Sequence, residues 1–372
     1  MRKFLSLLIS FSLLLSLCTA LAACNGKDPD TEQQENNGES EVPNGPDTNI
    51  ADTPTDSESG SDAETISDPA IEFITYNIAF YEATKTYMTV YYEGQTLEDY
   101  TIAKRALRLN SFVEHYMPDV LALQEVNWRW WPYIIKNEDS IINTFGYEWE
   151  GNQGALRTQD GKGTSDLSLY NLLLWNPEKF EKIDGGVIRI NNRERLYGDG
   201  NKDRMCTWAI LKNKTTGVET LFASTHLCTR GDDSLKDLNL SQAKVLTEKL
   251  IALAEGRTII VGGDFNASQS SSTYKHITTQ AGFSDAHETA KINRAPLMAS
   301  TRFWGENTKW KNGNPIDHIF YFGDTYTAEK YAVLYDTFDE NNVISQDMSK
   351  VGKYYDLSDH LGVFTRFIEK GQ

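Results

Sequence analysis

Asp264 and Asn266 stand two residues apart, directly after an apolar run and two glycines, in the stretch Thr258-Ile-Ile-Val-Gly-Gly-Asp-Phe-Asn-Ala267. Side chains at positions i and i+2 of an extended segment share one face. The carboxylate and the carboxamide should therefore project together from the end of a buried strand, and the glycines would let the backbone pass close to whatever they hold. The stretch predicts a binding or catalytic site, although by itself it is more typical of a strand that ends in a turn.

Further polar side chains stand at the apparent ends of other strands. They are Asn77, Glu125, His226, Asp317, Asp359 and His360. The neighbouring runs are alternating or continuously apolar, as expected of half-buried and buried strands. Each residue alone could be an ordinary turn or cap residue, so the prediction of a site rests on how many of them coincide.

The elements that carry these residues alternate between strands and helices. Strands are predicted at 71–77, 119–125, 172–175, 186–190, 205–212, 220–227, 258–263, 316–321 and 358–364. Helices are predicted after a capping box of Thr96 and Asp99 up to Pro118, from Asn127 to Ile142, from 240 to 254 and from 271 to 280. Strand, helix and strand at this spacing are typical of a layered α/β domain.

Tryptophans gather in two segments. Trp128, Trp130 and Trp131 follow the Glu125 strand, and Trp304 and Trp310 lie in an expected loop at 301–314. We interpret the first three as packing residues of the core or rim rather than as a substrate platform, because indoles bury a large apolar area.

The first 69 residues differ from the rest of the chain. Residues 1–23 resemble a secretory leader: a basic start, an apolar run from Phe4 to Leu17 and small residues before Cys24. The run is short of the roughly 20 residues that a membrane span needs. Leu21-Ala-Ala-Cys24 resembles the lipobox of bacterial lipoproteins, so Cys24 is predicted to carry a lipid. Residues 24–69 then form a disordered acidic tether with almost nothing to bury.

The acidic charge of the chain belongs largely to this region. Residues 1–69 hold 3 of the 36 Lys and Arg residues and 13 of the 53 Asp and Glu residues, which leaves −7 of the total −17 for residues 70–372. Residues 70–372 are long and apolar enough for one large domain, and they show no long basic run. Tight nonspecific binding of polyanions through a cationic surface is therefore not indicated.

Two cysteines remain beyond the leader and the predicted lipidated Cys24, namely Cys206 and Cys228. They lie on two predicted strands joined by the hairpin Lys214-Thr-Thr-Gly217. In an exported protein they could form a disulfide if the strand register placed them opposite each other, and a slip of one residue would prevent it. The sequence leaves this open.

In chain order, the motifs Tyr-Asn-Ile, Leu-Gln-Glu-Val, Ser-Thr-His-Leu, Gly-Asp-Phe-Asn-Ala, Ile-Asp-His-Ile and Ser-Asp-His-Leu-Gly-Val resemble those of the endonuclease/exonuclease/phosphatase superfamily. The resemblance covers residues 71 to about 368, and the ordered set is far more specific than any single motif. It implies an α/β fold in four layers, with two mixed β-sheets face to face and helices outside. The site would lie at one rim, where strand ends converge.

The resemblance also implies a role for each residue. Mg²⁺ or Mn²⁺ would be held by Glu125, with Asn77 and Asp359 close by, and hard oxygen ligands fit these ions. Asp264 would orient or deprotonate the attacking water, and Asn266 would hold a phosphate oxygen. The remaining roles concern the phosphate. His360, polarised by Asp317, and His226 would bind the phosphate and stabilise its charge. His226 could also protonate the leaving oxygen, and Arg204 would lie near the scissile phosphate.

Two departures from the superfamily pattern are visible. The acid or amide partner expected for His226 cannot be aligned around Leu169-Tyr-Asn171. Ala79 stands where some nucleases of the superfamily have an acid, which weakens the case for a second metal position.

The expected function is that of a metal-dependent phosphodiesterase acting on nucleic acid, monomeric, extracytoplasmic and lipid-anchored to a bacterial membrane. Three alternatives remain. A sphingomyelinase-type phospholipase is favoured by the anchor and by Trp304 and Trp310, and an inositol-phosphate-type phosphatase is the second. The third, an inactive binding module on the same fold, is disfavoured by the intact set of acids and histidines, although a fold alone does not fix function.

Overall fold

The computed structural model describes residues 69–80, 95–151, 170–191, 204–231, 233–294, 299–301, 313–350 and 353–371. Cys24, the leader and nearly all of the expected tether lie outside these residues, as do Trp304 and Trp310. Within the described part, none of the helices combines the length and the apolar character that a membrane crossing requires.

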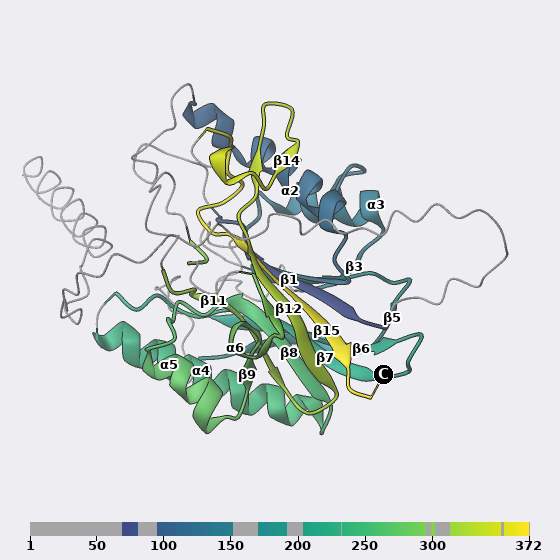
Figure 1. The fold of residues 1–372 in the computed structure, drawn as a ribbon, viewed down its shortest axis with the longest axis vertical. Helices are drawn as coiled ribbons and strands as arrows, with labels where there is room; N and C mark the ends of the chain where they lie inside the picture. Colours follow the sequence, from purple (N-terminus) through teal and green to yellow (C-terminus); the bar gives the residue numbers. More distant parts are fainter. Residues whose placement is uncertain are drawn as a thin grey trace, which may run out of the picture.

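Two mixed β-sheets form the centre of the molecule (Figure 1). The first contains, in spatial order, β10 (Ile292–Asn293), β12 (Tyr326–Leu334), β15 (Gly362–Glu369), β1 (Ile71–Asn77), β2 (Val120–Val126), β4 (Tyr170–Trp175) and β3 (Glu148–Glu150). The second contains β5 (Phe180–Arg189), β6 (Met205–Asn213), β7 (Glu219–His226), β8 (Thr258–Asp264), β11 (Asp317–Phe322) and β9 (Ser284–Asp285). A separate small pair is formed by β13 (Thr337–Phe338) and β14 (Ile344–Ser345). Each large sheet has a parallel pair at its middle, β1 with β2 and β7 with β8.

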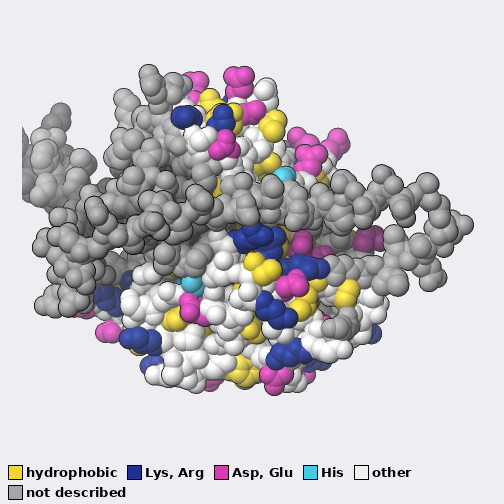
Figure 2. Space-filling view, viewed as in Figure 1, with side chains coloured by type: hydrophobic (Ala, Val, Ile, Leu, Met, Phe, Trp, Pro, Cys, Tyr) yellow, Lys and Arg dark blue, Asp and Glu magenta, His cyan; other side chains and the backbone are white. Residues whose placement is uncertain are grey.

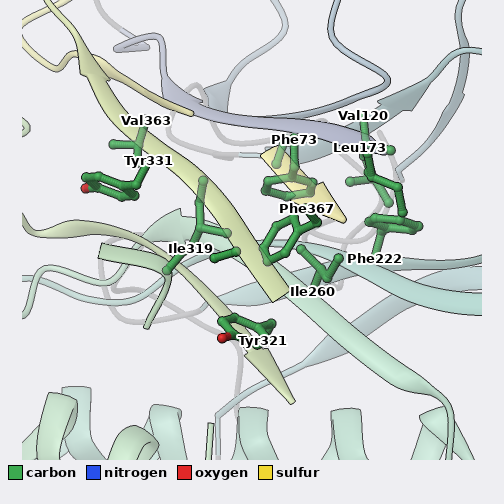
Figure 3. Close-up of a cluster of buried hydrophobic side chains, with 14 of the residues drawn as sticks. Phe73, Val120, Leu173, Phe222, Ile260, Ile319, Tyr321, Tyr331, Val363 and Phe367 are labelled. Carbon is green, nitrogen blue, oxygen red and sulfur yellow. The ribbon is translucent and has the colours of Figure 1, made fainter. Parts of the chain in front are cut away.

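The two sheets pack face to face around an apolar core, part of which Figure 3 shows. Phe73 from the first sheet stacks on Phe222 from the second, with ring centroids 6.2 Å apart. Ile260 and Phe367 belong to the same fully buried cluster. Inward-facing residues of both sheets are apolar because burial of such surface contributes about 25 cal/mol per Å².

Helices cover the outer faces of both sheets. In the order of the chain they are η2 (Leu97–Tyr100), α2 (Ile102–Tyr116), η3 (Pro132–Lys136), α3 (Ile141–Phe145), α4 (Asp233–Ala254), α5 (Ser272–Lys275), η4 (His276–Gln280), α6 (Ala286–Thr289) and η6 (Met348–Lys350). Figure 1 shows α2 and α3 on one side of the sandwich and α4 and α5 on the other. Separate apolar clusters join each helical layer to its sheet. The predicted fold of two mixed sheets with helices outside is confirmed.

Several boundaries differ from the prediction. Thr96 and Asp99 do form a capping box, but it caps η2, while Thr101 caps α2 by accepting a hydrogen bond from the backbone N–H of Lys104. The Trp-rich segment is not one helix. Its turn leads into η3, which has Pro132 at its first position, and α3 begins separately at Ile141. Strand β15 begins at Gly362 rather than at 358, and α4 begins at Asp233 rather than at 240.

Cys206 and Cys228 are both buried and are not joined by a disulfide. The register of the β6–β7 hairpin places Cys206 opposite Thr225, which is three residues before Cys228. Burial raises the pKa of the Cys206 thiol, so this side chain behaves as a small apolar group of the core.

Candidate active site

Strand ends from both sheets meet at one edge of the sandwich. Asn77 ends β1 and Glu125 lies at the end of the neighbouring parallel strand β2. In the second sheet, Asp264 is paired with His226 on one side and with Asp317 on the other. Since the carboxyl ends of parallel strands lie at the same edge, this register alone brings the polar side chains of each sheet together.

The two glycines before Asp264 are required by packing of the sheets. A Cβ on Gly263 would lie 2.1 Å from the backbone oxygen of Thr225 on β7. A Cβ on Gly262 would lie 2.5 Å from the ring of Phe73 in the opposite sheet. Close packing of the strands is therefore a sufficient reason for both glycines, and the expected approach of the backbone to a bound group remains a prediction.

Asn77 is fully buried and lies between the acids of both sheets. Its side-chain Nδ2 donates to Glu125 Oε1 at 3.2 Å and to Asp264 Oδ2 at 3.0 Å, and it lies 3.4 Å from His360 Nε2. Its Oδ1 accepts the backbone N–H of Ala79 at 3.0 Å. In this arrangement Asn77 connects the carboxylates, and its role as a ligand through oxygen remains a prediction.

Glu125 is held in a strained backbone conformation, with φ of 63°. Non-glycine residues rarely adopt this region, and such strain is typical of functional sites. The backbone N–H of Phe80 donates to Glu125 Oε2 at 2.8 Å. Burial raises the pKa of Glu125, and the negative charge of Asp359 raises it further. Two carboxylates in such surroundings have the donor chemistry that a hard divalent cation stabilises.

Asp264, Asp317 and His360 form a second group that could hold a metal ion, since one ligand atom from each lies within 4.8 Å of the others. Yet His360 Nδ1 is 2.8 Å from Asp317 Oδ2. Burial alone would lower the pKa of His360, but the charge and hydrogen bond of Asp317, with Asp264 and Asp359 nearby, raise it well above its usual value. A protonated imidazole offers no lone pair to a metal, so the assignment of the ion to Glu125 and Asp359 remains a prediction that competes with this group.

His226, Asp264 and Asn266 form a compact group on the second sheet. His226 Nε2 lies 3.3 Å from Asp264 Oδ2 and 3.1 Å from Asn266 Nδ2. The backbone N–H of Asn266 donates to Asp264 Oδ1 at 2.8 Å, and Asn266 has a positive φ of 48°. Burial and the charge of Asp317 raise the pKa of Asp264 to about 7, whereas burial, with Arg204 and His360 nearby, lowers the pKa of His226 well below its usual value.

Arg204 and Asp359 lie next to the same group. Arg204 is buried directly before β6, and burial lowers its pKa while the charges of Glu125 and Asp264 oppose this effect. Asp359 interacts electrostatically with Glu125 and with His360. The structure thus brings together every predicted residue of the site that it describes.

Two residues that support the site, Arg105 and Ser300, were not predicted. Arg105 is fully buried; it donates from Nη2 to the backbone oxygens of Ile78 and Ala79 and from Nε to the oxygen of Leu357 at 2.5 Å. Ser300 donates to Asp317 Oδ2 at 2.6 Å. The sequence hinted that Arg105 is buried, because it stands beside the apolar positions of its helix. No sequence pattern pointed to Ser300.

The partner of His226 was left open by the sequence. Its Nε2 is next to Asp264, the last residue of β8, and to Asn266, which follows that strand. Its Nδ1 lies 3.9 Å from Glu125 Oε1. The superfamily pattern places a partner of this histidine on an earlier strand. Here the groups beside Nε2 come later in the chain than His226.

If Asp264 acts as a base, the reaction should speed up as the pH rises toward about 7, because its carboxylate form is needed and its pKa is raised to about 7. A divalent cation bound nearby would shift this rise to lower pH, since positive charge favours the carboxylate. The measurement is kcat/KM between about pH 5 and 9, with Asp264→Asn expected to lack the rise. A wild-type rate that falls between pH 5 and 7 would contradict the role.

A cluster of carboxylates, histidines and one arginine at the rim of a two-sheet sandwich defines a metal-dependent hydrolase of phosphoric esters. The chain belongs to the endonuclease/exonuclease/phosphatase family, whose model matches residues 74–360.

Among curated proteins, the chain is 29% identical over 258 residues to the probable CCR4-Not complex 3'-5'-exoribonuclease subunit Ccr4 of Encephalitozoon cuniculi, covering 61% of this chain and 50% of that protein. It is 24% identical over 216 residues to Nocturnin of Xenopus laevis, covering 55% and 50%. The chain thus spans about half the length of the curated relatives it matches. A mannosyl-6-phosphatase structure from Bacteroides thetaiotaomicron covers 80% of this chain and 99% of its own at 19% identity, with a TM-score of 0.58, and shares the fold.

Proposed function

We propose that this protein hydrolyses phosphodiester bonds in nucleic acid. The observation that carries the proposal is the convergence, at one rim, of Asp264 with a pKa raised to about 7, His360 with a pKa raised by Asp317, and the interacting acids Glu125 and Asp359. The name of the Encephalitozoon cuniculi relative, an exoribonuclease subunit, supports nucleic acid as the substrate.

Glu125 and Asp359, with Asn77 hydrogen-bonded to Glu125, would hold Mg²⁺ or Mn²⁺. When bound, such an ion supplies positive charge that polarises a phosphoryl oxygen. The protein groups around it have complementary tasks: Asp264 accepts the proton of the attacking water, and His360 and Arg204 stabilise the negative charge that builds on the phosphate.

His226 and Asn266 would hold a phosphate oxygen from the second sheet. The lowered pKa of His226 leaves it neutral near pH 7, when it can donate one N–H hydrogen bond but is a poor proton source. The negative charge of a bound phosphate would raise that pKa, so protonation of the leaving oxygen by His226 belongs to the substrate complex.

Trp128 adds support for nucleic acid. Its neighbours Trp130 and Trp131 are buried as expected, but Trp128 is 47% exposed and lies three residues beyond Glu125. The guanidinium of Arg129 lies 5.3 Å from the Trp128 ring centroid. An exposed indole beside a cation can stack a base while the cation attracts the backbone. On the face shown in Figure 2, basic and acidic side chains are interspersed, so binding would depend on local contacts of this kind.

The function is tested by incubating the purified protein with Mg²⁺ or Mn²⁺ and, in parallel, DNA, RNA, sphingomyelin and inositol phosphates. We expect cleavage of nucleic acid to be fastest, with Trp128→Ala raising KM for an oligonucleotide but not for a small chromogenic phosphodiester. Faster turnover of sphingomyelin or an inositol phosphate would replace the proposal with the corresponding alternative.

We also propose that the protein is held outside the cytoplasm on a bacterial membrane by a lipid on Cys24, on the basis of Leu21-Ala-Ala-Cys24 and the acidic tether. Cys24→Ala should abolish incorporation of a labelled fatty acid without changing phosphoesterase activity. Undiminished labelling of the variant would rule the anchor out.

A further inference from the structure

The active site is divided between the two sheets. Asn77 and Glu125 are carried by strands of the first sheet, and residues 359–360 lead directly into β15 of that sheet. His226, Asp264 and Asp317 are carried by the second. Distances that matter for the chemistry therefore cross the interface. Three of them are Asn77 Nδ2 to Asp264 Oδ2 at 3.0 Å, His360 Nδ1 to Asp317 Oδ2 at 2.8 Å and Glu125 Oε1 to His226 Nδ1 at 3.9 Å.

Directly beneath the site, the side-chain amide of Gln124 is one of several buried polar groups that cross this largely apolar interface. Asn171 also donates to the backbone oxygen of Met205, and Thr220 to Tyr326, between the sheets.

Gln124 is fully buried. Its Nε2 is 3.1 Å from Ser224 Oγ in the second sheet and 3.0 Å from Thr75 Oγ1 in the first, while Thr75 Oγ1 lies 3.3 Å from Gln124 Oε1. Ser224 Oγ in turn donates to the backbone oxygen of Leu123 at 3.2 Å. Both contacts of Ser224 thus join β7 to β2 across the sheets.

Each member of this network is one or two residues from a residue of the site. Gln124 precedes Glu125, Thr75 is two residues before Asn77, and Ser224 is two residues before His226. Asn77 is also paired with Gln124 in the strand register. Glu125 sits at φ 63°, a conformation that costs on the order of 1–3 kcal/mol and persists only where the surroundings hold it.

We propose that Gln124, through its contact with Ser224, is a positioning residue that sets the separation between the two halves of the active site. The proposal rests on the function given above only in requiring that both halves act on one phosphate. The network has two arms. The Ser224 arm joins the sheets, whereas the Thr75 arm lies within the first sheet.

The alternative is that the amide is a buried polar group whose hydrogen bonds merely contribute to stability. In that case the two arms are equivalent, and loss of either hydroxyl should have the same consequences. A positioning role predicts that they differ, because of these two arms only the Ser224 arm crosses from one sheet to the other.

The test compares Ser224→Ala with Thr75→Val, each of which removes one buried hydroxyl from the same network. Gln124→Met is the direct variant but risks the fold, whereas each single-hydroxyl variant leaves Gln124 Nε2 a hydrogen bond to the backbone oxygen of Ala122 at 3.0 Å. We expect similar losses in Tm of roughly 2–4 °C for both variants. For Ser224→Ala alone, kcat should fall by about tenfold to 10²-fold, as expected for misplacement of groups by a fraction of an ångström to 1 Å.

Calorimetric titration with Mg²⁺ supplies the second readout. Its Kd should be unchanged in both variants, because Glu125 and Asp359 are both positioned by the first sheet. Wild-type kcat in Ser224→Ala, or equal losses of kcat in the two variants, would overturn the proposal. The two variants are compared on whichever phosphoester the wild-type protein cleaves fastest. A failure of the nucleic-acid proposal would therefore appear in the substrate preference of the wild type, whereas a failure of the Gln124 proposal would appear in the kcat of the variants.

Discussion

Glu125→Gln should lower kcat by about 10²-fold or more at a fixed, moderate concentration of Mg²⁺, and higher Mg²⁺ should restore part of the loss. The substitution keeps the volume of the side chain and its place beside Asn77, but it removes the charge that attracts the cation. A bound divalent ion contributes several kcal/mol to stabilising charge in the transition state, and each 1.36 kcal/mol corresponds to a factor of ten in rate.

The reason for a large effect lies in the surroundings of this carboxylate. Glu125 is buried, and its pKa is raised by that burial and by the charge of Asp359. Without a cation this arrangement is unfavourable, so the ion and the two acids should stabilise one another strongly. Removing one acid relieves the repulsion but leaves Asp359 as a single, weaker anionic ligand.

The measurement combines turnover at several Mg²⁺ concentrations with calorimetric titration of the ion. Glu114→Gln is the matched control, because Glu114 is exposed on α2. Its turnover and metal affinity should equal those of the wild type. Unchanged Mg²⁺ affinity in Glu125→Gln would instead favour the group Asp264, Asp317 and His360 as the metal site.

Much of the fold could be predicted because its strands end in recognisable ways. The β8 stretch and the runs that end in Asn77, Glu125 and His226 are short apolar segments followed by a polar residue, and the structure places them as expected. By contrast, β12 was missed. Its sequence Tyr-Thr-Ala-Glu-Lys-Tyr-Ala-Val-Leu does not alternate strictly, and the β12–β15 register is interrupted between Ala328 and Lys330.

The geometry within the site depends on contacts that no local pattern encodes. The positive φ angle of Glu125 occurs where the β2–β4 register is interrupted, between Leu123 and Val126, and those of Ala79 and Asn266 occur just beyond β1 and β8. Arg105, for example, donates to the backbone oxygen of Ala79 from α2, 26 residues further along the chain. The charge states of Asp264 and His360 likewise depend on burial and on through-space neighbours.

His360→Ala should lower kcat by on the order of 10²–10³, which is typical for loss of one group that stabilises charge in a transition state. Unlike Glu125→Gln, this variant should not be rescued by more Mg²⁺, and its affinity for the ion should stay close to that of the wild type. The physical reason is that His360 is cationic at neutral pH, since its pKa is raised well above the usual value despite burial. A protonated His360 would repel Mg²⁺, so we expect His360 to bind the phosphate instead.

Asp317→Asn tests the charge of His360 alone, because it keeps the imidazole in the site but removes the carboxylate that favours its protonated form. Asp317 is hydrogen-bonded to His360 Nδ1 at 2.8 Å and is the main group that raises the pKa of His360 against the effect of burial. With asparagine in its place the pKa of His360 should fall. As the pH rises, kcat should therefore decline at a lower pH in the variant than in the wild type, because His360 loses its proton earlier. The acid limb set by Asp264 should also move to lower pH, because the charge of Asp317 raises the pKa of Asp264. Between the two limbs, kcat should exceed that of His360→Ala, because the imidazole is still present and protonated.

The pH dependence of kcat for wild type, Asp317→Asn and His360→Ala, measured beside Mg²⁺ titrations, decides the matter. His115→Ala, at an exposed position on α2, is the matched control and should behave as the wild type. If His360→Ala abolished Mg²⁺ binding while Glu125→Gln left binding and turnover intact, the two assignments would have to be exchanged. In that case His360 would bind the ion as a neutral ligand, and Asp317→Asn would weaken Mg²⁺ binding instead of moving the alkaline limb of the pH profile.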